Sequence, residues 1–162
     1  MTAKDAIRFS LKSNRDFFNK FLADFTDADM LVRPVPGANH AAWQVGQVVA
    51  AEVGMILPKI PGAKPPALPL GFVDKHGGKT AADDTGFWTK AEYMDLYNKG
   101  REASLAALEL FPDADLDKDP QLGWGDMVPN FGAMFLFLGM HDMMHAGQFS
   151  VIRRKLGKPV LF

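Results

Sequence analysis

The sequence predicts an all-α protein, a four-helix bundle with a long proline-rich crossover loop between the second and third helices. Apolar residues recur at helical spacing in four long segments, and proline and glycine interrupt the chain between them. No stretch of any length alternates apolar and polar residues as a strand does. The chain has 162 residues, 48% of them hydrophobic and 23% charged. This size and composition suit a single domain over 1–162.

The first helix is expected from about Ala3 to Phe25. Its apolar residues fall at spacings of three, four and seven: Ile7, Leu11, Phe18, Phe21 and Leu22. The second helix is expected after Asn39, a suitable N-cap, and runs to Leu57 before Pro58 stops it. Its many Ala, Gly and Val residues let neighbouring backbones approach closely, which predicts a central position.

The segment after the second helix predicts a long connection, since five prolines lie between residues 58 and 72. It extends to about Gly86 and is either a crossover packed along the bundle or a functional loop. The third helix opens with a capping box, Thr89 and Glu92, and ends near Phe111. Its expected apolar face carries Tyr93, Leu96, Tyr97, Leu105, Leu108 and Leu110.

The fourth helix is expected from about Asn130 to Leu156, because Gly157 and Pro159 follow as natural end signals. Its first half is apolar on all sides, which predicts burial on more than one side. Two explanations are open for the segment Phe131–Met140. A second copy of the chain covers the extra face in a homodimer, or the proline-rich loop covers it.

The charge balance excludes some classes of partner. The formal net charge is −1, so no basic surplus exists to bind nucleic acid or an anionic membrane. Arg153 and Arg154 are expected to form the solvated last turn of a helix. Without cysteine, the chain can supply neither a disulfide nor a thiolate. The charged start lacks the apolar core of a signal peptide, and the longest uncharged run, 127–140, is too short to span a bilayer. We expect a soluble, cytoplasmic protein.

Two of the four histidines lie one helical turn apart in the fourth helix. Leu138, His141, His145 and Ile152 step by three, four and seven, which places both imidazoles on the core-facing stripe. The spacing also brings two ring nitrogens within reach of one divalent metal ion. The alternative is a pair of buried histidines that hydrogen-bond to backbone or carboxylate groups. The motif lacks the glutamate that marks metalloproteases.

A catalytic metal needs a third ligand, and the candidates are His40, Gln47, Glu52 and Asp142. Gln47 shares a helical stripe with Trp43, which predicts that it faces inward. Its amide could bind the metal weakly or hydrogen-bond a histidine.

Two other polar residues are expected to lie outside the site. Asp142 points about 100° away from His141 on a helix, which predicts a solvated position or an indirect contact with the site. His76 falls in the loop "DKHGGKT" and is expected to be solvated.

Two stretches resemble the DinB-like four-helix-bundle superfamily of metalloenzymes, and the resemblance covers nearly the whole chain. They are "DFTDADMLVRPVPGANHAAWQVGQ" and "HDMMHAGQFSVIRRKLGKP". The resemblance implies three metal-binding histidines, one in the second helix and two in the fourth. His141 and His145 match the pair in the fourth helix. Gln47 stands at the position of the remaining histidine, and Ala146 stands where arginine is common. A neutral amide oxygen binds Zn or Ni less well than imidazole does.

The resemblance implies two kinds of function. Relatives include thiol-dependent transferases and isomerases that use bacillithiol or mycothiol. One hypothesis is therefore a metal-dependent enzyme of the thiol-dependent transferase or hydrolase type. It would act on a small-molecule substrate with a degenerate His141, His145 and Gln47 site. The other is a binding or stress-response protein with no metal, no cofactor and no catalysis, with a pocket lined by Trp43, Met134 and Phe135. No residue is assigned as a general base.

Overall fold

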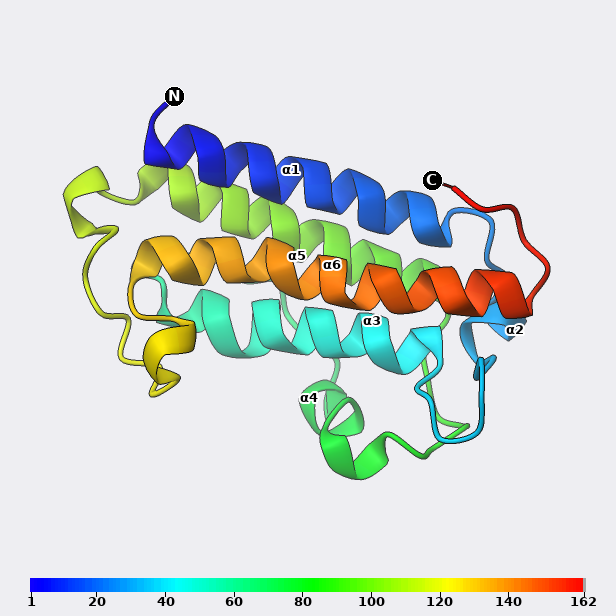
Figure 1. Cartoon of the computed structure of the whole chain (residues 1–162). Helices are drawn as coiled ribbons and strands as arrows, with labels where there is room; N and C mark the ends of the chain where they lie inside the picture. The colour runs from blue at the N-terminus through cyan, green and yellow to red at the C-terminus, as the bar shows by residue number, and fades with distance from the viewer. Residues whose placement is uncertain (162) are drawn as a thin grey trace.

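The computed structural model describes residues 1–161, and within them it contains helices and no strand. The long segments are α1 (Ala3–Leu22), α3 (Ala41–Val49) continued by η1 (Ala50–Ile56), α5 (Lys90–Leu110) and α6 (Phe131–Lys155) (Figure 1). The short elements are α2 (Asp27–Met30), η2 (Leu57–Lys59), α4 (Phe72–Lys75), η3 (Gly78–Thr80), η4 (Asp113–Asp115) and η5 (Gly125–Met127). The all-α prediction is confirmed.

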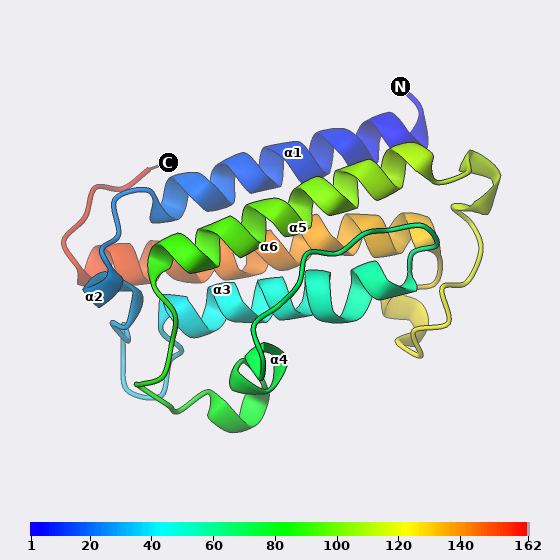
Figure 2. The same cartoon turned by 180° about the vertical axis from the view of Figure 1, so that it is seen from behind.

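The long segments lie side by side as a helical bundle (Figures 1 and 2). α1 packs against α5 and α6, and α3 packs against the same two helices. Phe18 of α1 marks the centre of the core. Its ring stacks on Tyr97 of α5 at 4.4 Å and meets Phe149 of α6 edge-on at 5.2 Å. Aromatic contacts of this kind join three helices at one level of the bundle.

The helix starts follow local capping chemistry. Thr89 accepts a hydrogen bond from the backbone N–H of Glu92 at the start of α5, so the predicted capping box is confirmed. At the start of α3, the prediction of Asn39 as N-cap is wrong. His40 is the cap, and its Nδ1 accepts from the N–H of Trp43 at 3.1 Å. A histidine with a free Nδ1 lone pair substitutes there for the usual small polar cap.

The second long segment widens into π-helical geometry at residues 50–56. One extra residue in the turn shifts the side chains that follow, a feature common near functional sites. Here Val53 packs against Gly100 of α5, where an added Cβ would lie 2.7 Å from the Val53 methyl carbon. The close approach brings Glu52 to the α5 side, where it is buried.

The crossover between η2 and α5 runs over the side of α5 and α3 (Figure 2). It is irregular in its proline-rich first half, as predicted, and then forms α4 and η3. The prediction that His76 is solvated is wrong, because the ring is 1% exposed. It lies against Gly46 of α3, where any Cβ would overlap with it. Its Nδ1 donates to the Phe72 carbonyl at 2.8 Å, so its Nε2 accepts from the Tyr93 hydroxyl at 2.7 Å.

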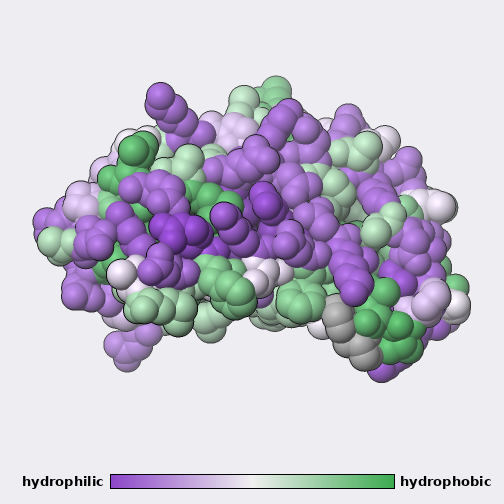
Figure 3. Space-filling view, turned by 90° about the horizontal axis from the view of Figure 1, so that it is seen from above, coloured by the Kyte–Doolittle hydropathy of each residue, from purple (hydrophilic) through white to green (hydrophobic). Residues whose placement is uncertain are grey.

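The outer surfaces of the bundle differ in polarity. Hydrophilic side chains cover most of the α1 side of the molecule (Figure 3). α6 instead exposes a stripe of apolar residues: Leu136, Met140, Met143, Met144 and Val151. In the first half of α6, which was expected to be buried on more than one side, only Leu136 and Met140 are exposed. Leu110, expected in the apolar face of α5, is 80% exposed.

The end of α6 is anchored by a buried arginine. The expectation that Arg153 is solvated is wrong, since it is 3% exposed. Its guanidinium binds the Asp24 carboxylate and the carbonyls of Phe21 and Pro159. These contacts join the α1 end to the chain after α6. Within residues 1–161, no helix is both long and apolar enough to span a bilayer.

Candidate functional site

His141 and His145 come together on α6. Their Nε2 atoms are 3.1 Å apart, and the ring planes are inclined by 68°. His145 is buried at 5% exposure, whereas His141 is half-buried at the edge of the helix. Phe137 stacks on the outer ring, with centroids 5.6 Å apart and planes within 19°. The i, i+4 spacing thus brings the Nε2 atoms of the two rings close enough to contact the same ion or each other.

Both imidazoles are neutral at physiological pH. Burial, and to a smaller extent the neighbouring His141, lower the pKa of His145 to about 3. Burial also lowers the pKa of His141. A neutral ring keeps a lone pair on one nitrogen, which is the form that binds a metal or accepts a hydrogen bond.

Gln44 of α3 holds the inner histidine. Its Oε1 lies 3.1 Å from Nδ1 of His145, and its Nε2 donates to the Asn39 carbonyl at 2.8 Å. Gln44 is 1% exposed, so both contacts are shielded from water. Sequence reasoning missed this residue because it lies off the Trp43 and Gln47 stripe. The available signal in the sequence was a second glutamine, one turn before Gln47, in an otherwise apolar segment.

Gln47 contacts the crossover. Its Nε2 donates to the backbone carbonyl of His76, and the side chain is half-buried. The face of α3 that carries Gly46 and Gln47 therefore packs on the α4 region, and the face that carries Gln44 packs on α6. Within residues 1–161, no three or more His, Cys, Asp or Glu residues form a group suited to hold a metal ion.

His40 is also occupied by the backbone. Besides capping α3, its Nε2 lies 3.1 Å from the Asp83 carbonyl, and the residue is fully buried. Burial lowers the pKa of His40. His40 thus joins the start of α3 to the end of the crossover.

Glu52 and Asp142 form a buried charged cluster with Arg101 of α5. Arg101 donates from Nε to Glu52 Oε1 at 2.9 Å, and its Nη2 lies 2.8 Å from Asp142 Oδ2. Ser104 donates to Glu52 at 2.7 Å, and Tyr97 donates to Asp142 at 2.9 Å. Among the residues described, Oδ1 of Asp142 has no hydrogen-bond partner. Burial raises the pKa of Asp142 to about 7, against the opposing effect of Arg101.

Of the two positions expected for Asp142, the solvated one is wrong, because α6 is buried over a wide arc. At 100° per residue, the buried residues of α6 span about 140° around the helix, from Ile152 to Gly139, and Asp142 falls inside this arc. The cluster places two carboxylates and one cation on the inner side of the histidine pair. Sequence reasoning missed Arg101, because a lone arginine in a polar helix reads as exposed.

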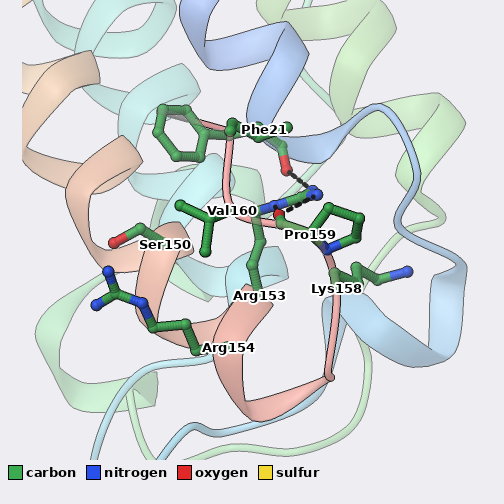
Figure 4. A pocket seen from close by; sticks show the side chains of 8 residues that line it. Phe21, Ser150, Arg153, Arg154, Lys158, Pro159 and Val160 are labelled. Carbon is green, nitrogen blue, oxygen red and sulfur yellow. Dashed lines mark hydrogen bonds between the residues drawn. The ribbon is translucent and has the colours of Figure 1, made fainter.

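A pocket of about 180 Å³ lies elsewhere, where the chain after α6 folds back toward α1 (Figure 4). Its lining residues are Phe21, Ser150, Arg153, Arg154, Lys158, Pro159, Val160 and Leu161. None of these residues is among the candidate metal ligands. Figure 4 shows the Arg153 guanidinium directed at the Phe21 and Pro159 carbonyls, so its charge is already used in the fold.

Comparison with known proteins supports the same assignment of the fold. A crystal structure described as the conserved protein of a locus from Enterococcus faecalis superposes with a TM-score of 0.67 at 16% sequence identity. The match covers 98% of this chain and 99% of that one. A search of curated proteins found no match. Residues 10–149 match the DinB superfamily, and the chain therefore belongs to that superfamily.

Proposed function

We propose that this DinB-superfamily protein is a metal-dependent enzyme of the thiol-dependent transferase or hydrolase type, with His141 and His145 as its principal metal ligands. The 3.1 Å separation of their Nε2 atoms carries the proposal. Two nitrogens at this separation, each about 2.1 Å from a common ion, subtend an angle of about 95°. That angle suits an ion with more than four ligands, such as Ni, and is tight for tetrahedral Zn.

Gln47 is the proposed third ligand. It lies one turn beyond Gln44 on α3, which runs antiparallel to α6 (Figure 1), so its level is that of His141. In the structure its Nε2 donates to the His76 carbonyl on the crossover side of α3, so binding of an ion through Oε1 requires the side chain to turn toward α6. An ion held there would lower the pKa of a coordinated thiol or water and so supply the nucleophile. The thiol would come from a low-molecular-weight cofactor, since the chain has no cysteine.

Elemental analysis of protein purified without an affinity tag tests the proposal. We expect one Zn or Ni per chain in the natural protein and none in His141→Ala and His145→Ala. Gln47→His should bind the ion more tightly, because imidazole is the stronger ligand. A natural protein that stays metal-free after incubation with Zn²⁺ or Ni²⁺, while Gln47→His fills, would refute the metal-dependent activity.

One observation favours a second candidate, a metal-free binding protein. His141 contacts His145, His145 contacts Gln44, and Gln44 contacts the Asn39 carbonyl. These contacts satisfy the buried side chains of His145 and Gln44 without any ion. In that case the polar cluster stabilises the bundle, and any ligand is bound without chemistry. Failure of the natural protein to take up metal is the result that favours this candidate.

Addition of a thiol to Co²⁺-loaded protein separates the two enzyme types. A thiol-dependent transferase should show a thiolate-to-cobalt charge-transfer band on addition of bacillithiol or mycothiol. A hydrolase should show none, and it should cleave an activated ester in a reaction that His141→Ala abolishes.

We also propose that the protein is a homodimer. The exposed apolar residues of α6 lie within about 100° of one another around the helix axis. Met143 and Met144 form the two edges of this stripe. The crossover runs over the side of α5 and α3 (Figure 2), which does not support the alternative that this loop covers the stripe on α6. An apolar stripe of this kind is typical of a contact between proteins.

A further inference from the structure

We infer that Gln44 is a positioning residue that selects the tautomer of His145. It holds the ring with its proton on Nδ1 and directs the bare Nε2 lone pair at His141. Three hydrogen bonds in series carry the inference: Gln44 to Asn39, His145 to Gln44, and His141 to His145.

The direction of the series follows from its first member. A backbone carbonyl can only accept, so the Asn39 oxygen faces the NH₂ group of Gln44, at 2.8 Å. The amide oxygen is thereby turned to Nδ1 of His145, at 3.1 Å. That oxygen can also only accept, so Nδ1 must carry the proton.

The other ring nitrogen is then determined. A neutral imidazole has one N–H, so Nε2 of His145 has a lone pair. It lies 3.1 Å from Nε2 of His141, which must donate in this contact. Gln44 is 1% exposed and His145 5% exposed, so water is excluded as a replacement acceptor.

The consequence for a metal rests on the proposed function. A histidine ligand is oriented by the hydrogen bond that its second nitrogen makes, usually to a carboxylate or a carbonyl. Gln44 supplies that bond with a neutral oxygen, and it adds no charge to the buried pair. The contact between Gln44 and His145 needs no ion, although Nε2 of His141 would have to give up its proton to bind one. The tautomer of His145 can therefore be measured independently of metal binding.

Long-range ¹H–¹⁵N correlation spectra of the metal-free protein, labelled at histidine and recorded at pH 8, test the inference. Gln44→Met removes the amide and keeps the size of the side chain. Gln44→Glu keeps an oxygen acceptor. Gln148→Met on the exposed side of α6 is the matched control. We expect the Nδ1–H form of His145 in the natural protein, in Gln44→Glu and in Gln148→Met, and loss of that form in Gln44→Met.

An Nε2–H form in the natural protein overturns the inference, as does an unchanged Nδ1–H form in Gln44→Met. Should Gln44→Met fail to fold by circular dichroism, the natural protein and Gln44→Glu still decide the question. Calorimetric titration with Ni²⁺ adds a second readout, in which Gln44→Met should bind about 10- to 100-fold more weakly and Gln44→Glu should not. No Ni²⁺ binding by the natural protein refutes the proposed function alone, because the spectra need no metal.

Discussion

Gly46 allows the ring of His76 to lie directly on the backbone of α3. A Cβ at this position would overlap with the ring, which the Phe72 carbonyl and the Tyr93 hydroxyl hold in place. We therefore expect Gly46→Ala to displace His76 and to lower the free energy of unfolding by about 1–3 kcal/mol, the usual cost of overpacking. Urea denaturation measures the change.

Gly147 provides the matched control for this substitution. It is a helical glycine of α6, it is exposed in the single chain, and no atom lies within 4 Å of where its Cβ would be. Because it lies within the stripe proposed as the dimer contact, the two variants are compared at a dilution at which the chain is monomeric. Gly147→Ala should raise the free energy of unfolding by about 0.5–1 kcal/mol, since alanine loses less backbone entropy in a helix. Equal effects of the two substitutions would contradict the assigned role of His76.

The burial of His76 also predicts a dependence of stability on pH. Burial lowers its pKa from the ordinary 6.5 to about 4. Between pH 6.5 and pH 4, His76 is protonated in the unfolded chain but stays neutral in the folded one. The contribution of His76 to the free energy of unfolding is therefore fully present above pH 6.5 and decreases as the pH falls toward 4.

The free energy of unfolding, measured by urea denaturation between pH 7.5 and 4.5, checks this sign. The slope due to His76 should be at most about 1.4 kcal/mol per pH unit. His76→Met introduces a side chain that does not titrate, so it should remove the contribution of His76 to the slope. The contributions of the other buried histidines should remain. A slope that is unchanged in His76→Met would show that the ring titrates normally.

The candidate site could be predicted only in part at the residue scale. His141 and His145 were recognisable because two ligand-type residues at i, i+4 must share a face of a helix. Gln44 was not, because its role depends on a carbonyl of the preceding loop. His76 was not, because a histidine in a glycine-rich loop looks solvated until a glycine on another helix makes room for it.

At the scale of elements, α3 shows why its inner face could not be read from periodicity. Nearly all of its residues are buried, since the crossover covers one side and α6 the other. Hydrophobic spacing then no longer distinguishes the side of Gln44 from the side of Gln47. The buried ion pairs of α5 were hidden for a related reason, because arginine is rarely found fully buried.

Arg101 links α5 to both η1 and α6, which predicts a large effect of its removal. Arg101→Met would leave Glu52 and Asp142 in the core without their cation. Loss of one partner of a buried ion pair costs about 3–5 kcal/mol. We expect a decrease of this size in the free energy of unfolding, measured by urea denaturation at pH 8, above the pKa of about 7 of Asp142.

Lys99 in the same helix is the control for that substitution. It pairs with Asp95 one turn away, and both side chains are more than half exposed. Lys99→Met should change the stability by less than about 0.5 kcal/mol, since exposed pairs contribute little. A loss below about 1 kcal/mol in Arg101→Met would mean that the cluster is hydrated or that its carboxylates are protonated.

At the scale of the whole molecule, the helical class and the order of the long segments followed from periodicity and from the prolines between them. The anchoring of the last segment did not. Arg153 lies in the final turn of α6, where a basic residue is expected for electrostatic reasons alone. Its burial depends on Asp24 and on the Phe21 carbonyl, both more than a hundred residues earlier, which no local pattern reveals.

The exposed stripe of α6 predicts the assembly state. Met140 and Met144 are 67% and 56% exposed, and they lie one turn apart in the stripe. Sedimentation velocity over a dilution series should show a dimer for the natural chain. The double variant Met140→Glu and Met144→Glu should be a monomer with an unchanged helical circular dichroism spectrum, because two carboxylates cannot be buried without partners.

Leu110→Glu is the control for the dimer test, because it places the same charge on an exposed apolar residue of α5, outside the stripe. It should leave the dimer intact. A monomeric natural chain would show that the stripe makes no stable contact with a second copy. A dimer that survives in the double variant but dissociates in Leu110→Glu would move the interface from α6 to the end of α5. The three samples together therefore assign the contact to one helix, and they do so without reference to metal or activity.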